Sequence, residues 1–336
     1  MFNQTVGGQP LQVSQLSRLL ETGEYKRCLE AAASLLAEGG HDKEGQARIY
    51  AAITRSCLAL TDYPAAVEAG RTAVLLAEAS GSADVLGSAL VDLATALGNT
   101  RRFEAALATF ARYLQMLPLF TAARCLEGRA LQRQADTCRR AGRPEEAVRA
   151  YRRAMRWFQR YGDDAGAIGC AQALVRLHID QGQLRSAARL LAVLDGHARA
   201  HPGDHEFLGT QLVDRALFHL RSGRSVESAR EAMAALELSP SLAVACRAQM
   251  MLAHAALEQN KPADALNFLF AARVGAIDAR LYDLEFEASR LLLSVLNGPD
   301  GQALLLEVDD AYCQAGVDIS HYLAADVAAG LPPRDE

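Results

Sequence analysis

Apolar residues recur at spacings of three and four along most of the chain, with polar residues between them. Around residue 101, the apolar residues are Leu90, Leu93, Ala94 and Leu97 before a turn, and Leu107, Phe110, Tyr113 and Leu114 after it. This spacing places apolar side chains on one face of a helix, and no sustained alternation indicates strands. Each stretch between turns therefore predicts a helix of about 15–20 residues.

Two positions repeat together along the chain: a turn residue, and a small residue five positions later. The turn residues are Gly23, Thr61, Arg101, Gly142, Gly182, Gly223, Asn260 and Gly298. The small residues are Cys28, Ala66, Ala106, Ala147, Ala187, Ser228, Ala265 and Ala303. Successive small residues are 38, 40, 41, 40, 41, 37 and 38 positions apart, and such even spacing indicates eight copies of one structural unit.

Each repeated position has a physical reason. Gly or Asn ends a helix well, because the residue after the last turn often adopts a positive φ. A small residue inside the second helix lets two helices approach closely. One helix pair cannot bury its apolar face alone, so neighbouring pairs must stack. The sequence predicts an all-α array of about eight antiparallel helix pairs over residues 10–315, followed by a capping helix and tail over 316–336.

These units resemble tetratricopeptide repeats. Gly23-Glu24-Tyr25 followed by Cys28 matches the Gly-acid-aromatic turn of that family, with Cys in place of Ala, and Asp62-Tyr63 followed by Ala66 is close to it. Other matches are the small residues seven before a turn and the prolines that end a unit: Ala94, Ala135, Ala216, Ala253, Pro118 and Pro240. The resemblance implies a right-handed α-solenoid in which the first helix of each pair lines the inner face.

The chain departs from the family pattern in two respects. Its period is near 40 rather than the family's 34, and both Arg101 and the last unit fit the turn pattern poorly. Longer periods are typical of relatives such as bacterial peptide-sensing regulators and kinesin light chains. The departures leave the pitch of the superhelix open, but not the helix-pair architecture.

The resemblance also predicts which side chains face the groove. Counting back from each turn gives the set Arg48, Arg55, Arg129, Gln132, Asp136, Arg139, Arg176, Arg247 and His254. Six of these are arginines, whose planar guanidinium groups donate paired hydrogen bonds to carboxylates or phosphates. The alternative interpretation is that they are solvated charges, paired with nearby acids.

Charge is distributed unevenly along the chain. The net charge is −5 and the pI about 5.9, which argues against a general nucleic-acid binder. Residues 129–160 nevertheless carry +7, and residues 277–336 carry −9. This polarity favours an acidic partner or head-to-tail self-association, unless it is only drift on a solvated surface.

The sequence carries no pattern of a known catalytic or cofactor site. GxSxG, HExxH, P-loop and GxGxxG arrangements are missing, so we expect neither an enzyme nor a bound cofactor. His197 and His201 stand four residues apart and form a weak metal candidate, although Pro202 and Gly203 follow at once, and exposed linker histidines are the alternative.

The sequence also predicts where the protein resides. Seven scattered cysteines without a CxxC indicate free, mostly buried thiols in a reducing compartment. The first residues do not form a secretory signal, and no apolar stretch is long enough to span a membrane. We therefore expect a cytoplasmic protein that does not enter a membrane.

These features predict a non-enzymatic scaffold that binds a protein or peptide, with acidic partners favoured. A rigid concave surface with different side chains on each repeat suits extended peptides or partner helices. Two alternatives remain open: a peptide-sensing regulator that acts through a separate partner, and a self-assembling adaptor that forms a homo-oligomer.

Overall fold

The computed structural model describes residues 13–238, 241–279 and 281–296, and within them it contains helices and no strands. The fifteen α-helices are α1 (Val13–Glu21), α2 (Tyr25–Glu38), α3 (Lys43–Ala59), α4 (Tyr63–Ser80), α5 (Ala83–Asn99), α6 (Phe103–Met116), α7 (Glu127–Arg140), α8 (Pro144–Tyr161), α9 (Asp164–Asp180), α10 (Leu184–Ala200), α11 (His205–Arg221), α12 (Ser225–Glu237), α13 (Leu242–Glu258), α14 (Pro262–Asp278) and α15 (Tyr282–Val295). Two short 3-10 helices, Leu117–Leu119 and Ala123–Leu126, join α6 to α7.

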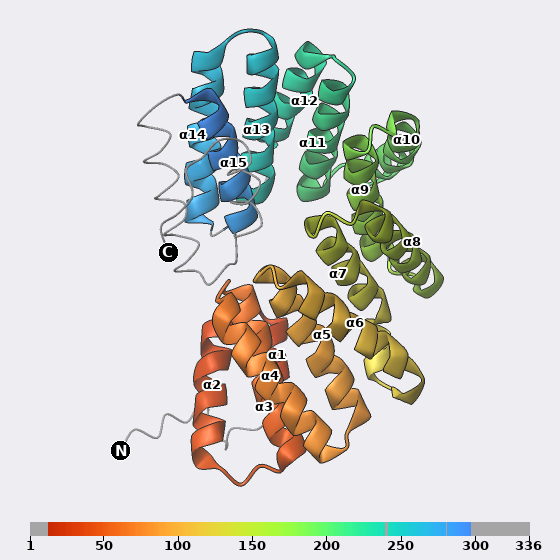
Figure 1. The fold of residues 1–336 in the computed structure, drawn as a ribbon, viewed down its shortest axis with the longest axis vertical. Coiled ribbons are helices and arrows are strands. Elements are labelled where there is room, and N and C mark those ends of the chain that lie inside the picture. Colours follow the sequence, from red (N-terminus) through yellow and green to blue (C-terminus); the bar gives the residue numbers. More distant parts are fainter. Residues whose placement is uncertain (1–12, 239–240, 280, 297–336) are drawn as a thin grey trace. The chain divides into compact units, whose positions relative to one another are not determined.

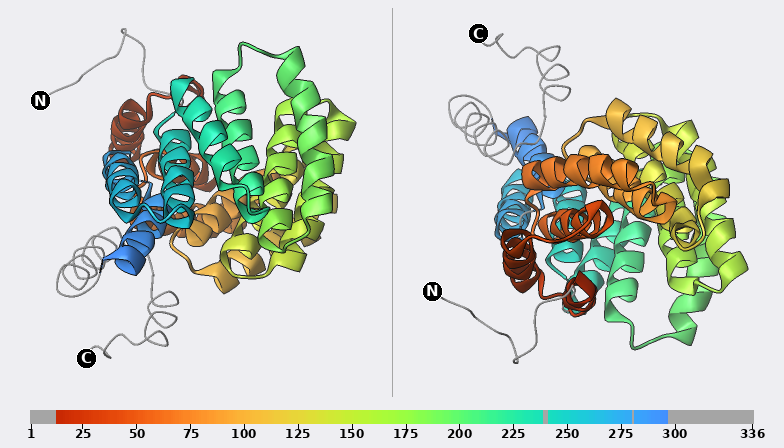
Figure 2. Two further views of the ribbon diagram at one scale, coloured as in Figure 1. Left: turned by 90° about the horizontal axis from the view of Figure 1, so that it is seen from above. Right: turned by 90° about the horizontal axis from the view of Figure 1, so that it is seen from below.

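Consecutive helices pack side by side as antiparallel pairs, in the order of a tetratricopeptide-like solenoid (Figures 1 and 2). The predicted all-α repeat architecture is confirmed for the described residues. They fall into two compact units that meet near residue 157: α1 to α7 with most of α8 form the first, and α9 to α15 form the second.

The eighth repeat is described only in its first helix, α15. Gly298, Ala303 and the predicted capping helix over 316–336 lie outside the described residues, so the domain boundaries stay predictions.

The predicted turns share one backbone conformation. All seven turn residues in the described range have a φ between 55° and 74°: Gly23, Thr61, Arg101, Gly142, Gly182, Gly223 and Asn260. In each turn the next amide donates to the carbonyl five residues back, as Asp62 does to Cys57 at 2.9 Å. This Schellman motif satisfies carbonyls that a helix end leaves without partners. Arg101, which fits the family pattern poorly, adopts the same turn as the glycines.

The predicted close contacts are also confirmed. The seven described small residues five positions after the turn are fully buried: Cys28, Ala66, Ala106, Ala147, Ala187, Ser228 and Ala265. The alanines seven positions before the turn, Ala94, Ala135, Ala216 and Ala253, are buried as well. Small side chains at both positions let the two helices of a pair touch, and a larger one would separate them.

The length of the helices explains the long period. Helices α3, α5, α9, α11, α13 and α14 each have 17 residues, and α4 and α8 have 18. Several begin at an aspartate whose carboxylate accepts a backbone N–H, as Asp163 does from Gly166 at 2.8 Å. Of the six described cysteines, five are buried and only Cys125 is exposed, so the prediction of mostly buried thiols is confirmed there.

Candidate functional site

Charged side chains gather on one side of the first helices. Positions 6, 9 and 13 before the turn residue are spaced by three and four, so they share one side of a helix. We name this side the first-helix face and define it by six residues. These are Arg55, Asp92 and Arg129 in the first unit, and Arg176, Asp214 and Arg247 in the second.

The first unit brings together Arg55 of α3, Asp92 of α5 and Arg129 of α7. The Arg55 Nε donates to the Asp92 Oδ2 at 3.0 Å. The Arg55 side chain is 46% exposed and that of Asp92 is 18% exposed. Arg129 lies close enough for its charge to lower the pKa of Asp92. Arg55 therefore pairs with Asp92, and Arg129 acts on the same carboxylate through its charge; we call these three residues the first cluster.

The second unit builds the same arrangement from Arg176 of α9, Asp214 of α11 and Arg247 of α13. The Arg176 Nε lies 3.5 Å from the Asp214 Oδ1. Asp214 is fully buried, and neither of its oxygens accepts a hydrogen bond from a described residue. The charges of Arg176 and Arg247 both lower its pKa. We call these three residues the second cluster.

Burial dominates the ionisation of both aspartates. It raises the pKa of Asp92 from 3.8 to about 6, against the opposing effects of Arg55 and Arg129. It likewise raises the pKa of Asp214 to about 6, against Arg176 and Arg247. Removing a carboxylate from water penalises its charged form, and the arginines offset only part of that penalty.

The remaining predicted groove residues lie in other surroundings. Arg48 pairs with Glu44 one turn earlier on the exposed surface of α3, at 2.7 Å. Asp136 accepts a hydrogen bond from the buried Tyr151 hydroxyl, and Arg139 lies near the same hydroxyl. The list is completed by two half-buried side chains, Gln132 and His254. Burial, with Arg221 and Arg290, lowers the pKa of His254.

Part of the basic 129–160 stretch is neutralised by nearby acids. Arg143 pairs with Glu104. Arg153 pairs with Glu127 at 3.3 Å, and Arg133 lies 3.7 Å from Asp136. For these three arginines, the contacts support the interpretation of the stretch as ordinary surface charge. Arg149, Arg152 and Arg156 remain exposed on α8.

The weak metal candidate takes a different geometry from the one that a shared metal needs. The His197 and His201 rings stack with their centroids 4.1 Å apart, and Phe207 packs edge-on against His197 at 5.0 Å. No group of three or more His, Cys, Asp or Glu among the described residues is placed to hold a metal ion.

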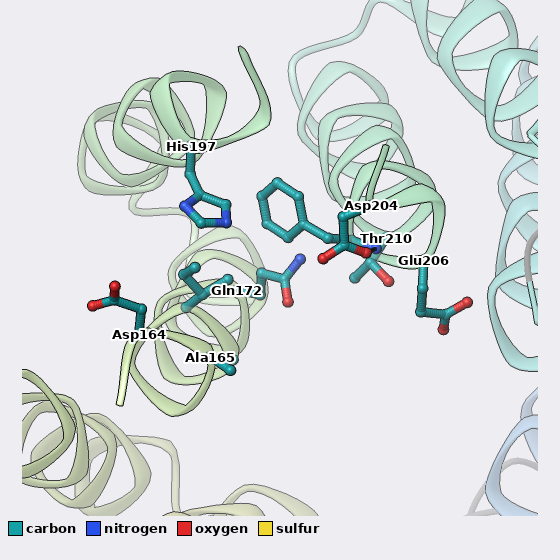
Figure 3. A pocket seen from close by; sticks show the side chains of 10 residues that line it. Asp164, Ala165, Gln172, His197, Asp204, Glu206 and Thr210 are labelled. Carbon is teal, nitrogen blue, oxygen red and sulfur yellow. Dashed lines mark hydrogen bonds between the residues drawn. The ribbon is translucent and has the colours of Figure 1, made fainter. Parts of the chain in front are cut away.

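His197 also lines an open cleft of about 330 Å³ between α9, α10 and α11. Gln172 points into this cleft between His197 and Asp204 (Figure 3). Its buried Nε2 donates to no described residue. The cleft can hold a small polar group, but the charged residues that surround it, Asp164, Asp204 and Glu206, are exposed.

Sequence reasoning found four of the six cluster residues and missed Asp92 and Asp214. The missed residues are acids in the segments LVDLA and LVDRA, where each directly follows the apolar pair Leu-Val. An acid directly after two apolar residues is a signal that could have found them, because buried charges need partners.

The stacked helix pairs, each with a Schellman turn and a close contact at a small residue, define a tetratricopeptide-like helical repeat protein. No protein-family sequence model matches the chain, and no curated protein matches it by sequence. Among solved structures, the chain is similar to NprR in complex with its cognate peptide NprX, with a TM-score of 0.66 and 13% identity over 91% of this chain and 89% of that one.

A Rap protein complexed with competence and sporulation factor gives a TM-score of 0.60 and 13% identity, covering 94% of this chain and 93% of that one. A tetratricopeptide repeat protein from Parabacteroides merdae gives 0.61 and 12%, covering 85% and 97%. At these identities the likeness shows the fold. No helix of the described residues combines the length and apolar character needed to cross a membrane.

Proposed function

We propose that this protein is a non-enzymatic scaffold that binds a peptide or an extended segment of a partner protein on its first-helix face. The observation that carries the proposal is the gathering of guanidinium groups from successive first helices, in two clusters that each retain one net positive charge. Arginines in this setting suit the carboxylates or phosphates of an acidic partner.

The structural neighbours support the choice of ligand class. Two of them are complexes, NprR with its cognate peptide and a Rap protein with competence and sporulation factor. Their fold is similar to that of this chain over 91% and 94% of its length, which supports a peptide as the ligand class. A regulator that changes its contact with a second protein when a peptide binds is the finer form of the proposal.

A catalytic role has weaker support. The clusters place guanidinium groups beside a carboxylate, and neither contains a hydroxyl or thiol nucleophile or a histidine base. His254 lies on α13, but none of its described partners is an acid that would orient it for proton transfer.

The proposal is tested by selecting binders from a random-peptide display library on the full chain. A charge-reversal variant, Arg55→Glu with Arg129→Glu and Arg176→Glu, is compared with a control that reverses three exposed arginines of second helices, Arg71, Arg189 and Arg230. Selected peptides are expected to bind the control as they bind the parent, and the test variant at least about tenfold more weakly. Equal affinity for the two variants would reject the first-helix face as the binding surface.

A further inference from the structure

The middle first helices of the two clusters carry nearly the same sequence. Residues 86–94 read LGSALVDLA and residues 208–216 read LGTQLVDRA, so six of nine positions are identical. Asp92 and Asp214 occupy the same place in the two segments, 122 positions apart. That separation is three repeats, and each copy lies in a different compact unit.

The outer members of the clusters follow the same rule. Arg55 and Arg176 both stand six residues before their turn and are 121 positions apart. Arg129 and Arg247 both stand thirteen residues before their turn and are 118 positions apart. An ion pair between two first helices, with an arginine of a third helix close enough to act on its carboxylate, therefore recurs at equivalent positions in both units.

A second, independent contact repeats in the same way. Asp84 in the first turn of α5 accepts a hydrogen bond from the Thr121 amide at 2.8 Å and another from the Thr121 hydroxyl. Glu206 in the first turn of α11 accepts from the Ser241 amide at 3.1 Å and from the Ser241 hydroxyl at 2.7 Å. Each acid joins the start of one first helix to the segment that leads into the next.

We infer that the second to seventh repeats are a tandem duplication of a three-repeat unit, and that each copy carries its own oxyanion-binding site, formed by Arg55 and Arg129 in one and by Arg176 and Arg247 in the other. The inference rests on the proposed function, and names the group that each site recognises: a carboxylate or phosphate of the bound peptide. Asp92 and Asp214 are positioning residues.

The chemistry of each cluster supports an anion. In each cluster one guanidinium pairs with the carboxylate and the second acts on it through its charge, so the carboxylate cancels only one of the two positive charges. A guanidinium has five N–H donors, and Arg55 gives one of them, its Nε–H, to Asp92. Arg55 is half exposed and Arg176 is 30% exposed, so both reach the surface.

The burial of Asp214 argues against a purely structural ion pair. Its oxygens accept no hydrogen bond from a described residue, and the nearest guanidinium nitrogen is 3.5 Å away. A pair kept for stability alone would be replaced by apolar side chains at little cost. An aspartate beside an arginine recurs at the equivalent position in the first unit, where Asp92 accepts from Arg55. The recurrence is explained if each aspartate orients arginines for a ligand.

The probe is sodium sulfate, titrated into the full chain labelled with ¹⁵N-arginine, with chloride at the same ionic strength as the control for screening. We expect the Nε–Hε signals of both clusters to shift, with midpoints within about threefold of each other because the sites are equivalent. Arg129→Gln should remove the response of the first cluster alone, and Arg247→Gln that of the second alone. The exposed Arg71 and Arg189 serve as internal controls.

Arg129→Lys and Arg247→Lys guard against misfolding, because they keep the charge and lose the planar fork. They should weaken sulfate binding at their own cluster by about threefold or more. The inference fails if sulfate shifts the cluster signals no more than those of Arg71 and Arg189. It also fails if only one cluster responds, or if Arg129→Gln changes both clusters equally.

Peptides then distinguish the sources of the oxyanion. Peptides selected on the parent chain are prepared with serine, phosphoserine or glutamate at each acidic position. A preference for phosphoserine assigns the site to phosphate, and a preference for glutamate assigns it to carboxylate. Peptides that bind equally well to a variant with all four arginines changed to Gln would overturn the inference and leave the proposed function standing. Failure to select any peptide would reject the proposed function itself.

Discussion

At the scale of single residues, Asp92 and Asp214 are the least expected feature. Asp92 is 18% exposed on α5, where most side chains are apolar and buried, and Asp214 is fully buried on α11. Each remains there because arginines from the neighbouring first helices offset part of its desolvation. Charges in such surroundings lower the stability of the fold. Their benefit is greatest where a bound ligand interacts with them.

The first prediction concerns pH. Both carboxyls have a pKa near 6 in the folded chain and an ordinary value of 3.8. Their contribution to stability is therefore fully present below pH 4 and is lost as the pH rises through 6. The double variant Asp92→Asn with Asp214→Asn should not show that loss. Between pH 4 and 7, the free energy of unfolding of the parent should therefore fall more than that of the double variant, by roughly 2–3 kcal/mol for each carboxyl.

Urea unfolding at pH 4, 5, 6 and 7 measures this difference. Asp278→Asn, which neutralises an exposed carboxyl on α14, is the control and should track the parent at every pH. Parallel pH profiles for the parent and the double variant would show that the two aspartates do not titrate in this range.

At the scale of the helical elements, the turn between the two helices of a pair is the most constant feature. Seven turns use the same backbone geometry, yet only four have glycine at the positive-φ position. The other three residues, Thr61, Arg101 and Asn260, adopt it at a cost in backbone strain. The hydrogen bonds that close the turn, together with the packing of the helices on either side, outweigh this cost.

The second prediction exchanges turn residues. Thr61 is β-branched and has a φ of 61°, whereas Gly182 has a φ of 70° and no atom within 4 Å of the position that a Cβ would take. Thr61→Gly should therefore stabilise the chain by up to about 1 kcal/mol, and Gly182→Thr should destabilise it by about 1–2 kcal/mol. Thermal unfolding of the two variants measures both effects. Changes of the same sign would mean that side-chain contacts, rather than backbone strain, decide at these turns.

At the scale of the whole molecule, the chain is two compact units, each built of stacked helix pairs. Stability in such arrays is a sum of repeat and nearest-neighbour terms, so a local defect affects mainly its neighbours. The duplicated clusters agree with this division, because each lies within one unit.

The third prediction places one defect in each unit. Ala106→Leu and Ala187→Leu insert a large side chain at a fully buried contact between paired helices, and each should cost about 1–3 kcal/mol. Hydrogen exchange should show lost protection in helices α3 to α7 for the first variant and α9 to α13 for the second. Equal loss across both units in either variant would show that the chain unfolds as one cooperative body.

The sequence by itself determined the repeat. The even spacing of turn and small residues gave the helix pairs, the positions of seven positive-φ residues and seven buried contacts, because these depend on local backbone geometry and on side-chain size. It also placed Arg55, Arg129, Arg176 and Arg247 on one side of their helices, because helical periodicity is local.

Only the tertiary structure decided which charges meet. Arg55 and Asp92 are 37 positions apart in the sequence, and their contact depends on the stacking of neighbouring helix pairs. Stacking also decides that Asp214 is fully buried and Asp92 largely so, while Arg48, which stands thirteen residues before its turn as Arg129 does, pairs with Glu44 on the surface. Burial and pairing arise from the surroundings of a side chain, which periodicity along one helix does not specify.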